Sequence, residues 1–545
     1  MSDALDGPTA TRHELVRPAL FTGLIALLWL LPGLLGHDPW RPEALSIGLV
    51  SHIVQSGDWV VPAIAGVPES DAFPLYHVTA AIIGRALDAI TPLHDAARLA
   101  SGLYMALAFV FVALATRELL GERDAWLAPL ALMGCIGLVA PAHGLSPDSA
   151  QVAAFALALY GLALAPRRAL GGGIALGCGV GAGFLSNGLL APLAFALSVA
   201  VLPLVSPSWR SRRLFVALVC AAIVLVPWLA VWPALLHAAS PEAFAAWWEQ
   251  TGTARFTAPL RHVPVTLAYF LGVLPWFAFP ALPLAIWAVW ARRREAQTRP
   301  AFALCIVLAV STLALLALDA GARQRDALPL LVPLAVLAVA GMHALRRSPA
   351  NAFWWFSILF GSIMVLMGWF EWSALELGFP AARQRHWIRQ QPAYVPDVEA
   401  ITLFLALVIT AIWVGVIKLA GNRRERPLMA WSGGVAVVWA LALAMFLDYA
   451  DLEKSYRPVA EAVATAARGA PCVGARDLAQ SQQVLISYLS GLALRAERDG
   501  TGCDLLLVQG QRNAIHTPDA GWQPLWEGSR SGERRELFRL YRRQP

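Results

Sequence analysis

Side chains that could perform group transfer lie in the polar stretches between long apolar runs of this 545-residue chain. Glu43 and Asp148 are carboxylates that could remove a proton from an acceptor hydroxyl. Arg323 and Arg325 could hold a leaving phosphate, because a guanidinium binds phosphate through two parallel hydrogen bonds. A carboxylate base, cations for a phosphate and an apolar groove for a lipid chain are together what transfer from a lipid-linked donor requires.

Asp148, the pair Arg323 and Arg325, and a further candidate, His262, also have simpler structural explanations. Asp148 begins an apolar run, and an Asp in that place commonly caps a helix by accepting a backbone N–H. An arginine pair such as Arg323 and Arg325 can bind lipid head groups instead of a substrate. His262 follows the aromatic segment 244–256, so it can be a member of an interfacial aromatic belt.

The elements that must position these residues are membrane helices. Hydrophobic residues make up 58% of the chain and charged residues only 14%, whereas soluble domains carry about 25% charged residues. This composition excludes a soluble enzyme and a disordered chain. The formal charge of +6, from 42 basic and 36 acidic residues, is too small an excess over this length to indicate nucleic acid as a partner.

Thirteen apolar runs are long enough to cross a bilayer core of about 30 Å, which needs about 20 residues of helix. The runs are 20–35, 97–117, 124–141, 148–165, 170–187, 188–206, 213–236, 264–291, 301–319, 327–345, 353–371, 399–418 and 428–447. The sequence therefore predicts an all-α polytopic membrane domain over residues 1–448.

The arginines fall at alternate ends of these runs, which sets the expected orientation. Arg12 and Arg17 place the N-terminus in the cytoplasm, and the same parity places residues 319–326, 372–398 and everything after 448 on the outer side. The parity holds only if residues 76–92 lie along the membrane, as an amphipathic interfacial helix does. We therefore expect a large first outer loop, 37–92, that contains interfacial helices.

Residues 449–545 have an ordinary hydropathy and predict a small outer α/β domain. Residues 504–509 and 537–542 are strand-like, and a helix is expected over about 478–493. Cys472 and Cys503 both lie on the side where a disulfide can persist, so a disulfide between them is expected, with two free buried thiols as the alternative.

A series of motifs along the chain resembles a known family. The motifs are DPWRPEA (38–44), SGDWVVP (56–62), DAFPLYH (71–77), LSPDSA (145–150), GFLSNGLLAP (183–192), WWEQTGTARF (247–256), LPWFAFPALPLAIW (274–287) and ALPLLVPLA (327–335). In this order and spacing they resemble the GT-C glycosyltransferases of the protein O-mannosyltransferase superfamily, and most closely the lipid A aminoarabinose transferase type. The resemblance covers about residues 15–345, with weaker support from SYRPVA (455–460).

This resemblance implies transfer of a sugar from a polyprenyl phosphate to an acceptor outside the cytoplasm, by a direct displacement that inverts the sugar's configuration. It also implies a GT-C fold with about thirteen spans. Asp148 matches the second acidic motif of the family. Asp71 and His262 match positions that can form a metal site, which makes a divalent metal the one possible cofactor. The substrate-binding residues are expected to be Asp38, Arg323, Arg325, Asn187 and Tyr76.

Three family positions are changed in this chain. Pro42 stands where relatives have the Asp that is their general base, directly before Glu43. Ala72 and Asn187 each stand where relatives have a lysine. A lost phosphate-binding cation weakens the stabilisation of the leaving group, which can amount to about 3 kcal/mol.

Three functions are consistent with these observations. The first is an active glycosyltransferase of the bacterial inner membrane, with a polyprenyl-phosphate sugar as donor and lipid A or another cell-envelope glycan or lipid as acceptor. In that reading Glu43 or Asp148 is the base. The second is a catalytically silent relative that binds a lipid-linked ligand or a partner enzyme. The third is a secondary transporter, which is disfavoured because the sequence shows no repeated pair of broken helices.

Overall fold

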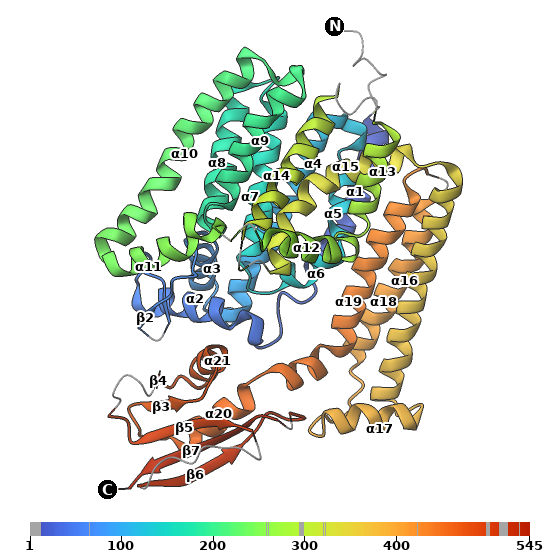
Figure 1. Cartoon of the computed structure of the whole chain (residues 1–545). Helices are drawn as coiled ribbons and strands as arrows, with labels where there is room; N and C mark the ends of the chain where they lie inside the picture. The colour runs from blue at the N-terminus through green and yellow to red at the C-terminus, as the bar shows by residue number, and fades with distance from the viewer. Residues whose placement is uncertain are drawn as a thin grey trace.

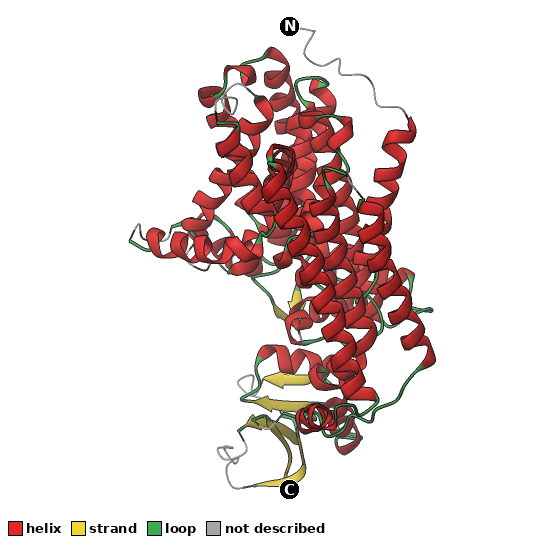
Figure 2. Cartoon of the chain, turned by 90° about the vertical axis from the view of Figure 1, so that its right-hand side faces the viewer, coloured by secondary structure: helices red, strands yellow, loops and turns green. Residues whose placement is uncertain are grey.

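The computed structural model describes residues 12–64, 66–257, 259, 261–293, 299–319, 321, 323–421, 423–496, 502–511, 521–533 and 535–544. A bundle of long helices forms most of the molecule, and a mixed sheet with its helices lies beyond one end of the bundle (Figure 1). Figure 2 shows that the strands gather at that end, with a small hairpin between the sheet and the bundle.

Long apolar helices occupy the positions of the apolar runs. Within the described residues, eight segments are long and apolar enough to span a membrane: α4 (Leu93–Leu120), α8 (Ala169–Asn187), α10 (Arg212–Ala239), α14 (Pro300–Ala317), η5 (Gln324–Leu330) with α15 (Leu331–Ala344), α16 (Arg347–Glu376), α18 (Ala400–Ala420), and α19 (Arg426–Lys454) with α20 (Arg457–Ala466). Three shorter apolar helical segments are Pro18–Leu30 of α1 (Arg12–Leu30), α7 (Asp148–Leu164) and α9 (Leu190–Val205). Together with two bent pairs, these segments correspond one to one with the thirteen predicted runs, which confirms the predicted fold class.

The two bent pairs are the part of the bundle that the sequence analysis did not anticipate. One joins Glu122–Met133, which ends in α5, to α6 (Ile136–His143) with a bend of 77°. The other joins α12 (Val263–Phe277) to α13 (Ala281–Ala291) with a bend of 101°. Pro280 lies in the second break, where a residue without a backbone N–H cannot continue the helical hydrogen-bond ladder.

Close helix packing depends on the glycines of α8. A Cβ at Gly172 would lie 2.7 Å from the Ala165 backbone, and one at Gly177 would lie 2.7 Å from the carbonyl oxygen of Ala221 on α10. Such contacts require residues without side chains, as is common between membrane helices. The glycine-rich stretch therefore serves packing of α8 against α7 and α10.

Short helices lie in the first outer loop, as predicted. This loop contains η1 (Arg41–Glu43), α2 (Ala44–Ser56), the hairpin β1 (Ala63–Ile64) with β2 (Val67–Pro68), and α3 (Pro74–Ala86). Gly57 ends α2 in the left-handed region, with φ of 73°, which suits a residue without a Cβ. Two more short helices, α11 (Pro241–Thr251) and α17 (Ala381–Gln390), follow long helices in later loops.

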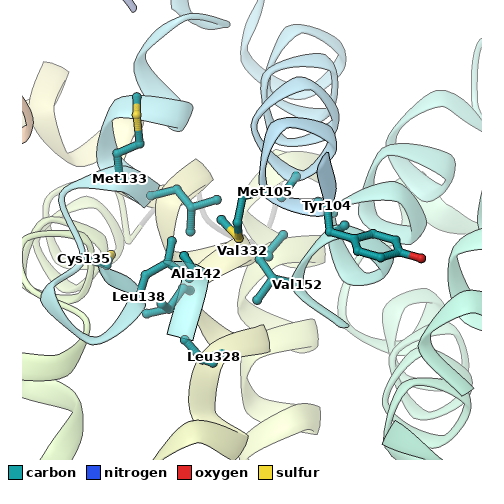
Figure 3. Close-up of a cluster of buried hydrophobic side chains, with 14 of the residues drawn as sticks. Tyr104, Met105, Met133, Cys135, Leu138, Ala142, Val152, Leu328 and Val332 are labelled. Atoms are coloured by element: carbon teal, nitrogen blue, oxygen red, sulfur yellow. The ribbon is translucent and has the colours of Figure 1, made fainter. Parts of the chain in front are cut away.

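The central core holds the inner parts of the site helices in place. Met105 on α4, Val152 on α7 and Val332 on α15 are all fully buried, and Figure 3 shows them meeting between the helices. Leu138 and Ala142 of α6 and Leu328 of η5 join the same cluster. This packing joins α4, α6, α7 and α15. It therefore fixes the positions of the helix ends that carry the polar residues.

The C-terminal domain is a five-stranded sheet with the order β4-β3-β5-β7-β6. Its strands are β3 (Val473–Arg476), β4 (Leu494–Ala496), β5 (Leu505–Gly510), β6 (Trp522–Gly528) and β7 (Leu537–Arg543), and α21 (Gln480–Ser490) connects β3 to β4. The strands β4, β3 and β5 are parallel, and β7 is antiparallel to both β5 and β6. A disulfide joins Cys472 to Cys503, whose Cα atoms are 5.5 Å apart, as the sequence analysis expected.

The predicted division of the chain at residue 448 falls within a helix. Helix α19 continues through this position to Lys454, and α20 begins three residues later. The division into residues 1–448 and 449–545 therefore stays a prediction.

Candidate functional site

Glu43 is a buried carboxylate whose hydrogen-bonding capacity is fully used. Its Oε1 accepts hydrogen bonds from Arg98 Nε at 2.8 Å and from the Leu145 backbone N at 2.8 Å. Its Oε2 accepts from Arg98 Nη2 at 3.1 Å and from the Trp40 backbone N at 2.9 Å. Burial alone would raise the pKa of Glu43, but the charge and hydrogen bonds of Arg98 outweigh burial and lower it.

Arg98, which pairs with Glu43, is completely buried near the start of α4. Besides the two bonds to Glu43, it donates to Asp95 Oδ1 at 2.7 Å, to the His37 carbonyl oxygen at 2.9 Å and to the Asp38 carbonyl oxygen at 2.9 Å. All five of its N–H donors thus have partners. Arg98 joins α4 to the start of the first outer loop, and Glu43 extends this connection to the loop that precedes α7.

Asp148 lies at the first position of α7 and is buried. Its Oδ2 accepts a hydrogen bond from Ser146 Oγ at 2.7 Å, and no side chain caps this end of the helix. The helix-capping explanation for Asp148 is therefore not what the structure shows. Glu43 holds the Leu145 backbone three residues before Asp148, so the saturated carboxylate of Glu43 positions the segment that presents Asp148.

Arg323 and Arg325 are exposed residues whose charges act on buried Asp148. Both guanidinium groups are close enough to interact favourably with its carboxylate. Arg323 also lies 3.7 Å from Asp71 Oδ2, and its backbone N donates to Asp326 Oδ2 at 2.6 Å. The first outer loop therefore meets the segment before α15 at the outer end of α7.

Arg255 is a functional candidate that the sequence analysis missed. Its Nη1 donates to Asn187 Oδ1 at 2.7 Å, its Nε donates to Asp319 Oδ2 at 2.6 Å, and its Nη2 lies 3.7 Å from Asp326 Oδ1. A positive charge is thereby present beside Asn187, the position at which the resembling family has a lysine. The signal was available in the sequence, since Arg255 is the one cation of the WWEQTGTARF motif.

The structure brings together one group of the predicted site residues. Asp71, Asp148, Asn187, Arg323 and Arg325 lie around Arg255 and Asp326, and we call these seven residues the charged cluster. They come from the first outer loop and from the outer ends of α7, α8, η4 (Thr253–Phe256) and η5 (Gln324–Leu330). Segments up to 255 residues apart in sequence therefore contribute to one site.

Two residues expected to bind substrate have other partners instead. Asp38 is buried, forms a bidentate ion pair with Arg457 and accepts from Ser455 Oγ at 2.6 Å, which ties the first outer loop to the C-terminal domain. These bonds outweigh burial and lower the pKa of Asp38. Tyr76 is fully buried and its hydroxyl bonds Ser101 Oγ at 2.8 Å, so burial raises the pKa of Tyr76. Tyr76 is therefore enclosed by the protein, and both carboxylate oxygens of Asp38 already accept hydrogen bonds from Ser455 or Arg457.

The proposed metal ligands do not form a suitable donor set. Asp71 faces Arg323, and His262 is exposed directly before α12. Among the residues with described coordinates, no group of three or more His, Cys, Asp and Glu side chains is arranged to hold a metal ion. The side chains present therefore do not fit a divalent metal site.

Two cavities lie elsewhere, between the first outer loop and the C-terminal domain. One of about 770 Å³ is lined by α2, the β1–β2 hairpin, α21 and β4. Another of about 470 Å³ is lined by Asp38, His94, Asp95, Asp451 and Arg457, among others. Neither includes Asp148 or Arg323, so the residue types of the charged cluster, and not cavity size, identify the candidate site.

Comparisons with known proteins agree with this architecture. Residues 80–232 match the family described as dolichyl-phosphate-mannose-protein mannosyltransferase. The chain is 27% identical over 433 residues to the undecaprenyl phosphate-alpha-4-amino-4-deoxy-L-arabinose arabinosyl transferase of Pseudomonas aeruginosa strain UCBPP-PA14, covering 76% of this chain and 72% of that one. The enzyme of the same name from Yersinia enterocolitica is 26% identical over 458 residues, covering 78% of this chain and 75% of that one.

Solved structures show the same fold over nearly the whole chain. The crystal structure of ArnT from Cupriavidus metallidurans bound to undecaprenyl phosphate has a TM-score of 0.71 at 16% sequence identity, and the match covers 97% of this chain and 98% of that one. The apo structure of the same protein has a TM-score of 0.68, covering 96% and 97%. In its matched domain, in its sequence over about three quarters of its length and in its fold, the chain is similar to the GT-C glycosyltransferases and to the aminoarabinose transferases among them.

Proposed function

We propose that this protein is an active membrane glycosyltransferase that moves a sugar from a polyprenyl-phosphate donor to lipid A or another cell-envelope acceptor. The observation that carries the proposal is the charged cluster, in which the buried Asp148 carboxylate interacts with Arg323 and Arg325 while Arg255 lies beside Asn187. The names of the similar enzymes support undecaprenyl phosphate as the lipid carrier and aminoarabinose as the sugar.

The proposed reaction is one direct displacement. Asp148 removes the proton from the acceptor hydroxyl, and the acceptor oxygen forms a bond to the anomeric carbon of the sugar. The bond between that carbon and the phosphate oxygen breaks at the same time, and the electron pair leaves with the polyprenyl phosphate. Arg323 and Arg325 stabilise the negative charge that develops on this phosphate.

Arg255 and Glu43 have supporting roles in this mechanism. Arg255 supplies positive charge beside Asn187 and so compensates for the absence of the lysine that relatives carry at this position. Glu43 positions the segment before Asp148 and does not act as the base, because each of its oxygens already accepts two hydrogen bonds. No step requires a metal ion.

The orientation follows from the arginine distribution. The charged cluster and the C-terminal domain lie on the side that the arginine parity assigns to the periplasm, with the N-terminus in the cytoplasm. We place the protein in the bacterial inner membrane, where the donor sugar faces the periplasm.

Transfer by the purified protein tests the proposal. The assay supplies undecaprenyl phosphate-linked aminoarabinose and lipid A and measures aminoarabinose on lipid A by mass spectrometry. The Asp148→Asn variant should lose at least 100-fold in turnover, because general-base catalysis contributes about 10²–10⁴-fold. Asp88→Asn, which neutralises an exposed carboxylate after α3, is the matched control and should retain full turnover. Full activity of Asp148→Asn would overturn the assignment of the base.

A catalytically silent relative is the second candidate, favoured by Pro42, Ala72 and Asn187. It predicts no turnover by the unaltered chain and a gain of turnover when Asp and both lysines are restored at these positions. Turnover by the unaltered chain would exclude it.

A further inference from the structure

Helix α17 connects two membrane-spanning helices by lying across their ends. It falls between α16 and α18, and Figure 1 shows it running crosswise beneath them, on the same side as the C-terminal domain. Only 22% of the apolar window of each of these two helices is buried within the protein, so both expose most of their surface to lipid. Helix α17 therefore lies where the hydrocarbon region gives way to head groups.

One face of α17 is fixed to the protein. Trp387 Nε1 donates to Glu371 Oε2 at 2.9 Å, and Arg383 Nε donates to the same oxygen at 2.7 Å. The Trp387 ring lies parallel to Phe446 with centroids 6.0 Å apart, and Tyr449 donates to the Trp387 carbonyl oxygen at 3.1 Å. These contacts to α16 and α19 hold the helix in one orientation.

The other face carries positive charge without a counter-charge. Arg385 and Arg389 are exposed and lie one turn apart, so they share a face of the helix, with exposed His386 beside them. Within the described parts of the chain, no carboxylate lies within ion-pair distance of Arg385 or Arg389. Arginines are normally enriched on the cytoplasmic side of membrane proteins, so their presence in this loop calls for a role.

Exposed apolar side chains precede and follow α17 in the sequence. Leu377 is 61% exposed, Phe379 is 76% exposed and Val395 is 79% exposed. Exposed apolar residues at both ends of a basic helix are typical of an element that lies in a membrane interface. In that position the apolar groups lie in the acyl region and the arginines lie at the phosphates. We call Arg385, Arg389, Leu377, Phe379 and Val395 the α17 surface.

We propose that the α17 surface binds the phosphate groups of anionic phospholipids in the surrounding bilayer. This inference goes beyond the transfer reaction and does not depend on it, since no residue of the α17 surface belongs to the charged cluster. Arg385 and Arg389, one helical turn apart, each present the forked N–H donors of a guanidinium to phosphate oxygens. The flanking apolar groups contact the acyl chains. Both arginines are exposed and so do not form an enclosed pocket for a free phosphate ion. This favours a lipid phosphate as the ligand.

Lipid binding by the detergent-solubilised full chain tests this proposal. The probes are phosphatidylglycerol and phosphatidylcholine, added separately, and native mass spectrometry gives the dissociation constant of the first bound lipid. The unaltered protein should bind phosphatidylglycerol more tightly than phosphatidylcholine. The double variant Arg385→Gln/Arg389→Gln should lose about 25-fold of the phosphatidylglycerol affinity, since each arginine near an anionic lipid surface contributes about fivefold.

A charge-matched control separates local binding from a general effect of charge. Arg468→Gln/Arg542→Gln removes two exposed arginines of the C-terminal domain, far in sequence from α17, and should leave both affinities unchanged. Equal phosphatidylglycerol affinity in the α17 variant and the unaltered protein would overturn the proposal. It would also be overturned by an equal loss in the control variant, or by full displacement of the lipid by millimolar inorganic phosphate.

Discussion

Glu43 and Asp148 are both buried carboxylates, but they differ in what surrounds them. Glu43 has four hydrogen-bond donors and a buried arginine partner. Asp148 has one hydroxyl donor and two arginines that reach it from the exposed side. The first arrangement suits a permanent charge that holds a loop in place, and the second leaves oxygen lone pairs available for a proton.

This difference predicts a separation of stability from activity. Glu43→Gln should lower the free energy of unfolding by about 1–3 kcal/mol, because it removes one of the two carboxylates paired with the buried Arg98 charge and weakens the hydrogen bonds that Glu43 accepts. Asp148→Asn should change stability by less than about 1 kcal/mol while abolishing transfer. Thermal unfolding in detergent, together with the transfer assay, measures both quantities. Normal stability of Glu43→Gln with loss of transfer would contradict the positioning role.

His77 predicts an acid sensitivity of the first outer loop. It is buried on α3, with Nδ1 2.7 Å from the Phe73 carbonyl oxygen, and burial lowers its pKa to about 4 from an ordinary value of 6.5. Between these two values the unfolded chain binds a proton at this residue and the folded chain does not. The stabilisation by neutral His77 is therefore complete above pH 6.5 and is lost as the pH falls towards 4, by about 3 kcal/mol in total.

The variant His77→Gln measures this effect, because its amide can still donate to the Phe73 carbonyl oxygen. Melting temperatures at pH 7 and pH 5 should fall less with acid in the variant than in the unaltered protein. Identical falls would show that other groups cause the acid sensitivity.

At the residue scale, the sequence located part of the site. Of the site residues named from the sequence, Asp71, Asp148, Asn187, Arg323 and Arg325 lie around Arg255 and Asp326, whereas Glu43, Asp38, Tyr76 and His262 have other surroundings. Their chemical roles stay predictions. The partners of Asp38 were beyond prediction, since Arg457 lies 419 residues away and nothing local in the first outer loop indicates that pairing.

At the scale of elements, spanning helices were predictable and their interruptions were not. Apolar composition located every long helix, because a bilayer requires a continuous apolar run. The same composition runs unbroken through the bends at residues 134–135 and 278–280, so hydropathy could not detect them. The strands β3 and β4 have only 4 and 3 residues, too few for a period of two to be recognised.

Contact between helix backbones predicts the effect of a single methyl group. A Cβ at Gly341 on α15 would overlap the carbonyl oxygen of Leu284 on α13. Gly341→Ala should therefore push these helices apart and lower the free energy of unfolding by about 1–3 kcal/mol. Gly415→Ala is the matched control, since no atom lies within 4 Å of a Cβ there. Equal melting temperatures for the two variants would contradict the close packing of α13 and α15.

At the scale of the whole molecule, the C-terminal domain depends on its disulfide. Cys472 precedes β3 and Cys503 precedes β5, so the bond links the starts of two adjacent parallel strands. Cys472→Ser/Cys503→Ser should lower the stability of this domain by about 2–4 kcal/mol. A reducing agent should lower the melting temperature of the unaltered protein and not that of the variant. Cys220→Ser, which replaces a half-buried free cysteine, should behave as the unaltered protein does.

The buried arginine of α4 also constrains how this protein can evolve. Arg98 holds two carbonyl groups of the chain entering the first outer loop, and through Glu43 it holds the segment before α7. A lineage that lost Arg98 alone would leave the buried Glu43 carboxylate without this cation, and one that lost Glu43 alone would leave Arg98 paired with Asp95 and the loop before α7 unheld, so the two codons should change together or stay fixed. Alignments of its orthologues should show paired replacement at positions 43 and 98, with single replacements almost never kept.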